Sequence, residues 1–520
     1  MQYFESPVFS FSADTFSWTE RSLTIGLLGI AVFTVLRFTY SPNRIPLINT
    51  RKLLEIGYSN AIQRFLVDGP NLVKNGLRKF QVFRILTNDG YQVVLAPEFA
   101  KEVRNSSAFS LSSSIARRFH ADIKGFEPFD VMTGYDRFFA ELIRAKLTPD
   151  LESMFRPISD ETAMVLDQEW TNNSEWHSFK CLKPSILAIT AQLSSRVFLG
   201  EPLCRDPNWV RITMVYTVDS HKASQALRRW PAALRPIIAR LLPSSRKIRA
   251  QIETARQIIE STLAERRRCK QAAKENGLSA PQYNDALEWV EELGQEKCPH
   301  HPVMAQLALA IAGIHNTAET LTQLLYDIYQ RKDLADALRE EAATVIARAG
   351  LTVSGLNQLE LMDSTMKESM RLKPPMIAAM QRITHSNVTL SDGTRIDKDS
   401  SVIVSATRMW DPKVYANPET FDAYRSLRAK QASGNHRNSQ AVTPTPEHLV
   451  WGLGKYACPG RFFAVAEIKI ILLHILLDYD LKVADGACTS PVSSGFSFRS
   501  NPNVEMFVRR RREGPSSLAT

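Results

Sequence analysis

The chain has 520 residues, 44% hydrophobic and 23% charged, which is an ordinary globular composition and excludes a disordered or fibrous protein. Its six cysteines lie far apart without a CxxC pair, which indicates reduced thiols in a cytosol-facing protein rather than a disulfide framework. The net charge of +10 favours an acidic protein partner or an anionic membrane surface. The basic clusters lack interleaved aromatic residues, so no nucleic-acid partner is expected.

An apolar run, Leu23–Leu36, lies near the N-terminus between two arginines. The run is short for a bilayer, but it suffices if the arginine side chains extend to the interface. Because more basic residues follow the run than precede it, we expect the N-terminus outside and the rest of the chain in the cytosol. We predict a membrane anchor within residues 1–40, a proline-containing hinge over 41–50 and one folded domain over 51–520. A cleaved signal peptide is the alternative, which the long acidic stretch before the run disfavours.

The domain is predicted to be mainly helical with a minor β-sheet region. After a first helix, Phe83–Thr87 and Tyr91–Leu95 flank Asn88-Asp-Gly90, a sequence typical of a hairpin turn. Helical spacing dominates most of the remaining chain and predicts helices over 138–146, 185–198, 247–273, 303–330, 333–349, 363–371 and 461–477. Between two of these, Leu227–Pro243 mixes apolar residues with arginines and three prolines. This segment is either a helix–helix connection or a contact with lipid headgroups.

The first candidate for chemistry is Cys458, in the stretch Trp451–Gly460. Glycines surround this cysteine, and an apolar helix begins directly after the stretch, at Arg461. Backbone N–H groups at a helix N-terminus favour a thiolate, which is a good axial ligand for iron. An inert, buried cysteine is the alternative.

Two further features stand upstream. The helix over 303–330 contains the polar segment Ala312–Thr317, where Gly313 would let a cofactor approach and a local break would leave polar groups to hold water or dioxygen. Hydrogen bonds from these side chains to the carbonyl four residues earlier are the alternative.

The second feature is the pair Glu368 and Arg371, which share one helix face at i and i+3. Arg425 could add a second guanidinium and complete a buried network. A surface ion pair is the alternative.

The order of these features along the chain resembles the cytochrome P450 family of haem-thiolate monooxygenases. Cys458-Pro-Gly-Arg-Phe-Phe-Ala464 is similar to the fungal microsomal branch of that family. The resemblance covers essentially the whole chain, and it implies the family fold, with a haem-thiolate catalytic domain over 51–520. It assigns Cys458 as the axial ligand of haem b, and Glu368, Arg371 and Arg425 as structural supports.

The resemblance also implies the residues that surround the haem. The family's basic positions for the haem propionates fall on Arg144 and Arg382. In the cysteine loop, Trp451 and Gly452 are expected at the cofactor, and Trp451 stands where the family usually has phenylalanine. Tyr456 stands where the family has arginine or histidine, so it could offer only a phenolic hydrogen bond.

The oxygen-binding segment departs from the family at one position. The family has an acid or histidine, then threonine, then threonine or serine, and these places fall on His315, Asn316 and Thr317. With Gly313, they are the candidate catalytic residues. Because an amide is a poor proton relay, we expect Thr317 or an ordered water to replace the missing hydroxyl. An atypical oxidation is the alternative.

The implied activity is oxidation of an apolar, terpenoid secondary-metabolite intermediate with O2 and electrons from NADPH. Expected partners are NADPH-cytochrome P450 reductase and cytochrome b5, and the expected location is the endoplasmic reticulum membrane, single-pass, with the catalytic domain facing the cytosol. Substrate contacts are expected near Phe109–Phe119, Ile311–Asn316 and Met376–Met380. A redox-neutral rearrangement or dehydration, or a non-catalytic haem-binding protein, is the alternative.

Overall fold

The computed structural model describes residues 45–133, 138–170, 172–297, 302–433 and 436–511. The chain divides into two compact units, Met1–Ile45 and Pro46–Thr520. The predicted anchor, Leu23–Leu36, lies outside the described residues. Within the described ranges, no helix combines the length and apolar character that crossing a bilayer requires. Part of the expected hinge belongs to the second unit, because Leu47–Ile48 forms a strand of its main sheet.

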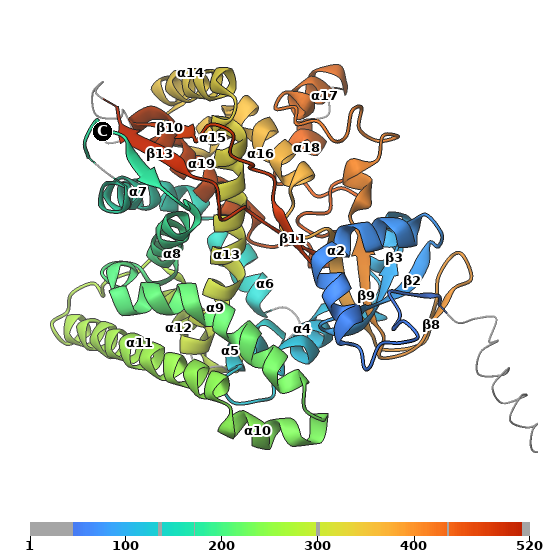
Figure 1. Cartoon of the computed structure of the whole chain (residues 1–520). Coiled ribbons are helices and arrows are strands. Elements are labelled where there is room, and N and C mark those ends of the chain that lie inside the picture. The colour runs from blue at the N-terminus through green and yellow to red at the C-terminus, as the bar shows by residue number, and fades with distance from the viewer. Residues whose placement is uncertain (1–44, 134–137, 171, 298–301, 434–435, 512–520) are drawn as a thin grey trace, which may run out of the picture. The chain divides into compact units, whose positions relative to one another are not determined.

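The main sheet has six strands in the order β1-β2-β3-β9-β6-β4, and it lies to the right in Figure 1. Its strands are β1 (Leu47–Ile48), β2 (Val82–Thr87), β3 (Gly90–Leu95), β9 (Ser401–Ser405), β6 (Ala378–Thr384) and β4 (Phe109–Ser110). β2 and β3 pair antiparallel with Thr87 opposite Gly90, which confirms the predicted hairpin. β1 with β2, and β3 with β9, pair parallel.

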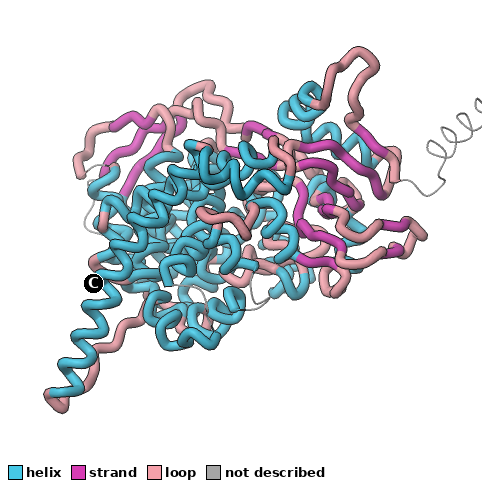
Figure 2. Tube along the Cα trace, turned by 90° about the horizontal axis from the view of Figure 1, so that it is seen from below, coloured by secondary structure: helices cyan, strands magenta, loops and turns pink. Residues whose placement is uncertain are grey.

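Smaller sheets complete the β structure. A three-stranded sheet of order β10-β13-β5 and the pairs β11–β12 and β7–β8 are formed by β5 (His177–Phe179), β7 (Val388–Thr389), β8 (Arg395–Ile396), β10 (Tyr479–Val483), β11 (Val492–Ser494), β12 (Ser497–Arg499) and β13 (Met506–Arg510). Figure 2 shows strands gathered at two places around a mass of helices. The predicted class, mainly helical with a minor sheet, is confirmed.

The helices before residue 300 include the first helix and those predicted over 138–146, 185–198 and 247–273, together with several that were not predicted. They are α2 (Ser59–Leu77), α3 (Ala100–Val103), α4 (Leu111–Phe119), α5 (Glu127–Thr133), α6 (Phe138–Leu142), α7 (Phe155–Glu169), α8 (Lys183–Leu199), α9 (Pro207–Arg228), α10 (Arg235–Leu241), α11 (Pro243–Glu275) and α12 (Ala286–Lys297). The helix predicted over 138–146 is α6 continued by a π-helical turn, Ile143–Leu147.

The later helices include those predicted over 303–330, 333–349, 363–371 and 461–477, whereas three shorter ones were not predicted. They are α13 (Pro302–Tyr329), α14 (Lys332–Ala349), α15 (Val353–Gln358), α16 (Glu360–Leu372), α17 (Arg425–Ser433), α18 (His436–Ser439) and α19 (Arg461–Asp478). α13 crosses the middle of the helical region in Figure 1 and packs along α8. Every residue of α13 from Val303 to Ala310 is buried, and all except Gln306 are apolar, as expected for a helix that is surrounded by other elements.

The segment Leu227–Pro243 connects α9 to α11 and includes the short helix α10. Leu227 and Ala239 are buried in this connection. Trp230, Leu234, Ile237 and Leu241 are exposed. The connecting role is therefore confirmed, and contact with lipid headgroups stays a prediction.

Candidate functional site

A cavity of about 300 Å³ brings together the segments that the sequence singled out. Its walls come mainly from α13, β6, the cysteine loop and the first two turns of α19, with further side chains from α6, the π-helical turn that follows it and α8. The lining residues that matter below are Leu309, Ala312, Gly313, Asn316, Thr317, Thr320, Ala378, Ala379, Met380, Trp451, Gly452 and Cys458. Two of the features singled out in the sequence, the polar segment of α13 and the cysteine loop about 140 residues later, thus share one cavity, whereas Glu368 and Arg371 are not part of its lining.

Hydrogen bonds to backbone carbonyls, one within the loop and one outside it, hold the cysteine loop in place. The Cys458 N–H donates to the Trp451 carbonyl at 2.8 Å, and the Trp451 indole N–H donates to the Ala441 carbonyl at 2.7 Å. Gly454 has a φ of +75°, and a Cβ there would lie 2.6 Å from the carbonyl oxygen of Arg104. The loop therefore needs glycine at 454 for its conformation and for its close contact with the neighbouring chain.

Cys458 faces the cavity immediately before the N-terminus of α19. Burial raises the pKa of its thiol, whereas the backbone N–H groups of Gly460 and Arg461 and the Arg461 charge lower the pKa. The predicted effect of the helix N-terminus is present, but burial outweighs it. A metal ion would reverse the balance, because a coordinating thiol loses its proton. This donor fits an iron ligand.

The cavity face of α13 is a stripe at helical spacing that includes Ala312, Asn316 and Thr320. Asn316 is exposed to this space. The Thr317 hydroxyl donates to the Gly313 carbonyl at 2.6 Å, so the alternative of a bond to the residue four earlier is confirmed for Thr317. α13 is continuous through Gly313, and the predicted interruption of the helix is wrong.

His315 lies on another side of α13 and is not part of the cavity lining. Its ring interacts with the backbone of Met214 on α9, and its Nε2 has no hydrogen-bond partner among the described residues. Burial lowers the pKa of this imidazole. Of the four predicted catalytic residues, Gly313, Asn316 and Thr317 therefore meet at the cavity, whereas His315 does not.

Arg382 is a buried cation beside the cysteine loop, 2% exposed. Its guanidinium carbon lies 4.7 Å from the ring centre of Tyr456, and its Nε has no hydrogen-bond partner within the described part of the chain. Burial lowers its pKa to about 10. A buried guanidinium with an unused donor fits an anionic group such as a haem propionate.

The other basic residues gather at the same loop. Arg144 donates from Nη2 to the Lys455 carbonyl at 3.2 Å, and the Lys455 ammonium lies 4.8 Å from the Tyr456 ring centre. Tyr456 thus replaces the family's cation with a ring that contacts two cations. Arg144, Arg382 and Tyr456 do not line the cavity themselves.

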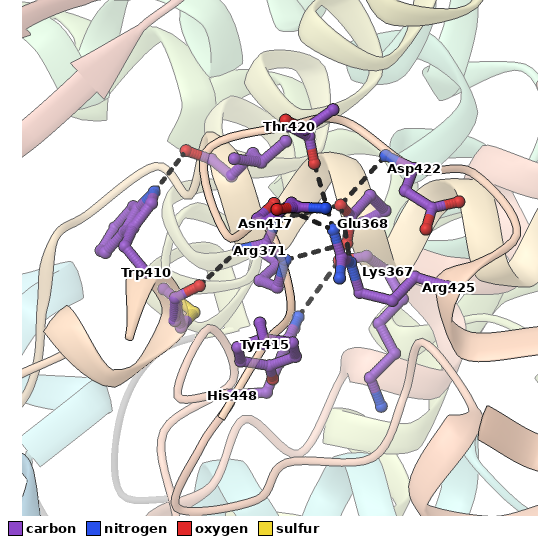
Figure 3. A network of polar contacts seen from close by, with 12 residues as sticks. Lys367, Glu368, Arg371, Trp410, Tyr415, Asn417, Thr420, Asp422, Arg425 and His448 are labelled. Atoms are coloured by element: carbon purple, nitrogen blue, oxygen red, sulfur yellow. Dashed lines mark hydrogen bonds and ion pairs between the residues drawn. The ribbon is translucent and has the colours of Figure 1, made fainter. Parts of the chain in front are cut away.

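Glu368, Arg371 and Arg425 form the predicted network, shown in Figure 3. Arg371 binds the two Glu368 carboxylate oxygens at 2.8 and 2.9 Å, and Arg425 Nε lies 3.1 Å from each of them. Glu368 and Arg371 are each 1% exposed, so the network is a buried one and the alternative of a surface pair is wrong. It joins α16 to the first residue of α17.

Some lining residues escaped the sequence analysis. Thr320 and Leu309 lie one to two helical turns from Asn316, so helical spacing could have found them. Phe198 comes from α8 and Phe139 from α6, and only the packing of distant segments places them here. Met376, Ala378, Ala379 and Met380 line the cavity as predicted, but the predicted contacts over Phe109–Phe119 do not.

Three neighbours along β6 line the same cavity, which a regular strand does not allow. Between Ala379 and Arg382 the strand advances three residues while β9 advances two, from Val404 to Val402. Met380 has a φ of +56° within this irregularity. The bulge turns Ala378–Met380 toward the cavity and Arg382 toward Tyr456.

Comparisons with known proteins agree with this geometry. The cytochrome P450 family matches residues 69–505. The cytochrome P450 monooxygenase adrA of Penicillium rubens is 40% identical over 497 residues, which are 94% of this chain and 96% of that protein. The cytochrome P450 monooxygenase trt6 of Aspergillus terreus is 43% identical over 462 residues, which are 88% of this chain and 93% of that protein.

The fold has a counterpart among solved structures. Cyanobacterial CYP120A1 bound to retinoic acid superposes with a TM-score of 0.65 at 18% identity, covering 86% of this chain and 96% of that chain. The family match and both fungal relatives span most of the chain, and family membership implies a haem-thiolate cofactor. The chain therefore belongs to the cytochrome P450 family and is a cytochrome P450 monooxygenase.

Proposed function

We propose that this monooxygenase uses haem b to oxidise an apolar, terpenoid substrate in fungal secondary metabolism. The observation that supports this most is the cavity, in which apolar side chains such as Phe139, Phe198 and Leu309 share the lining with Cys458 and Asn316. An apolar molecule would lose its hydration there. The fungal origin of the similar proteins supports the metabolic setting.

The cofactor would be held from two sides. Cys458 would ligate the iron, and Arg382 would bind an anionic edge group together with Arg144. Trp451 and Gly452 line the same cavity and would cover the ring. When bound, the haem supplies the activation of dioxygen that the side chains of the chain lack.

The side chains of α13 would then determine where water is held in the cavity and how protons are delivered. Asn316 presents an amide to the cavity, which can hold a water molecule but does not pass a proton readily. The Thr317 proton is already given to the Gly313 carbonyl, so its hydroxyl can accept a hydrogen bond and can donate one only after rotating. We propose that an ordered water on Asn316, assisted by Thr317, delivers protons.

For partners and location we propose NADPH-cytochrome P450 reductase, cytochrome b5 and a single-pass anchor in the endoplasmic reticulum membrane with the domain facing the cytosol. The net charge of +10 supports an acidic partner, and the apolar run before the folded domain supports an anchor.

The test uses the full chain expressed in yeast microsomes with its reductase. The reduced protein with carbon monoxide should absorb at about 450 nm, as expected for a thiolate-ligated haem. Cys458→Ala should remove the band, and the matched variant Cys488→Ala, at an exposed cysteine, should keep it. A Soret band typical of a nitrogen ligand in the wild type would overturn the assignment.

The substrate would be sought by comparing metabolites of a strain that lacks the gene with those of the parent. An apolar terpenoid that accumulates in the deletion strain, and that the microsomes convert with NADPH and O2, is the expected result. Accumulation of a polar, non-isoprenoid compound would contradict the substrate class.

One observation favours a second function. Asn316 stands at the cavity where the family has a hydroxyl, which suits a redox-neutral rearrangement or dehydration. Such an enzyme would convert its substrate without NADPH, so a strict requirement for NADPH and reductase would rule it out.

A further inference from the structure

One residue of the β6 bulge, Gln381, contacts two arginines. Its side-chain oxygen Oε1 accepts a hydrogen bond at 3.1 Å from Nη1 of Arg118, which lies on α4. Its backbone carbonyl accepts a hydrogen bond at 2.7 Å from Nη1 of Arg382. The arginine proposed to hold the haem is therefore connected, through the residue before it, to an arginine on a distant helix.

The bulge needs contacts from outside β6 to keep its shape. Met380 and Gln381 are not in register with any residue of β9, because the ladder passes directly from Ala379 to Arg382. Met380 also has a φ of +56°, a conformation that residues with a side chain rarely adopt. Such a conformation persists where the surrounding structure imposes it. The hydrogen bond from Arg118 is a contact of this kind, because it ends on the residue that follows Met380.

Arg118 is itself held by two other elements. Its Nε lies 3.1 Å from a carboxylate oxygen of Asp89, in the turn between β2 and β3. Its backbone carbonyl accepts hydrogen bonds at 2.6 Å from the Ser224 hydroxyl and from Nη2 of Arg228, both on α9. Arg228 also pairs with Asp89. These contacts fix the point from which the Arg118 guanidinium reaches Gln381.

The position of Arg382 depends on Gln381. The Arg382 guanidinium has the Gln381 carbonyl as a hydrogen-bond acceptor and the Tyr456 ring as a second contact. A hydrogen bond with a charged donor is about twice as strong as one between neutral groups, so both bonds to Gln381 restrain its peptide unit. A shift of this peptide unit would move the Arg382 guanidinium away from Tyr456.

We infer that Arg118 is a positioning residue for the haem and for one wall of the substrate cavity. It acts through Gln381, which has Met380 on one side and Arg382 on the other. Neither Arg118 nor Gln381 lines the cavity that contains Cys458, whereas Met380 does. The inference rests on the proposed function, because that function assigns Arg382 to an edge group of the haem.

The main test measures haem loss from purified, full-length protein to apomyoglobin. Arg118→Met keeps most of the side-chain length but removes the donor, and it should speed haem loss about five- to tenfold. Gln381→Met removes the acceptor and should have the same effect. The double variant should lose haem no faster than either single variant, because both act through one hydrogen bond. Arg118→Lys can still donate and should recover most of the wild-type rate.

A second measurement reports on the cavity wall. The probe is 4-phenylimidazole, which binds the haem iron and occupies the space beside it. Its dissociation constant, read from the shift of the Soret band, should rise about threefold or more in Arg118→Met and Gln381→Met, because the wall at Met380 is no longer held in place.

Arg117→Met is the matched control. Arg117 precedes Arg118 on α4, and it donates to the Asp399 backbone carbonyl at 2.7 Å instead of to Gln381. The control removes the same charge from the same helix and should change both measurements less than about twofold. If Arg118→Met does not fold, Gln381→Met replaces it, because this variant keeps the contacts of Arg118 with Asp89 and α9.

Unchanged haem loss in Gln381→Met would overturn the inference, and so would additive effects in the double variant. A purely structural role of Arg118 would lower the melting temperature of Arg118→Met and leave Gln381→Met like the wild type. Failure of the proposed function has a different result, since the wild type would then lack the carbon monoxide band at about 450 nm or Arg382→Gln would retain haem as the wild type does.

Discussion

The guanidinium carbon of Arg382 lies 4.7 Å from the ring centre of Tyr456, beside the loop that carries Cys458. In this chain, the position where the family usually has a cation holds an aromatic ring, and that ring contacts a cation from β6. Tyr456→Phe should keep haem content, because the ring remains. Arg382→Gln should lower the ratio of haem to protein about tenfold, because the anionic edge of the haem loses its buried partner. Equal haem content in both variants would show that Arg382 does not hold the cofactor.

The buried network around Glu368 should be essential for stability. Glu368→Ala leaves the guanidinium groups of Arg371 and Arg425 without their carboxylate and should lower the free energy of unfolding by about 3–5 kcal/mol. Glu265→Ala, which removes an exposed ion pair with Arg268, should lower it by less than about 1 kcal/mol. Urea unfolding of both variants gives the comparison, and similar losses would contradict the structural role.

Gly454 and Gly486 form a matched pair for testing the cysteine loop. Both have a positive φ, +75° and +73°, but a Cβ at 454 would lie 2.6 Å from the Arg104 carbonyl, whereas one at 486 meets nothing within 4 Å. Gly486→Ala should therefore cost about 1 kcal/mol of stability from the backbone alone. Gly454→Ala should cost about 1–3 kcal/mol more, with loss of the 450 nm band, because the steric clash adds to the strain.

Stability should depend on pH through Glu467, which is fully buried in α19. Its Oε1 accepts a hydrogen bond from the Ser194 hydroxyl at 2.9 Å, and burial raises its pKa to about 8. Between the unfolded pKa of about 4.3 and the folded pKa, the unfolded chain is ionised while the folded chain keeps its proton, so stability falls as the pH rises. Glu467→Gln should flatten the stability profile between about pH 5 and 8, measured by urea unfolding. An unchanged slope would show that Glu467 is ionised in the folded protein.

The role of Asn316 can be tested by restoring the family's residue. Asn316→Thr places a hydroxyl on the cavity face of α13 and should raise the fraction of NADPH that appears as product, because a hydroxyl relays protons better than an amide. Thr320→Ala, on the same stripe one turn later, serves as the control and should leave the coupling unchanged. Unchanged coupling in Asn316→Thr would show that the amide at position 316 does not limit the delivery of protons.

The sequence was most informative where local chemistry determines structure. The hairpin around Asn88-Asp89-Gly90 and the helix that follows Cys458 were predictable because turn residues and apolar spacing act over short distances. The pair of Glu368 and Arg371 was predictable from its spacing on one helix face. The contact of Arg425 with this pair was expected, but no spacing along the chain required it. The placement of His315 was not, because neighbours on one helix point in different directions and only the contact with α9 decides which of them reaches the cavity.

The bulge in β6 sets both the cavity wall formed by Ala378–Met380 and the position of Arg382. Deleting one residue at the bulge would restore regular pairing of β6 with β9. Because successive side chains of a strand alternate between the two faces of a sheet, the residues after the deletion would then point to the opposite face. Arg382 would then leave Tyr456, and the wall formed by Ala378–Met380 would lose a member. Changes in the choice of oxidised carbon and in cofactor retention should therefore appear together in length variants of this strand, whereas point substitutions at Ala378 or Ala379 can alter selectivity alone.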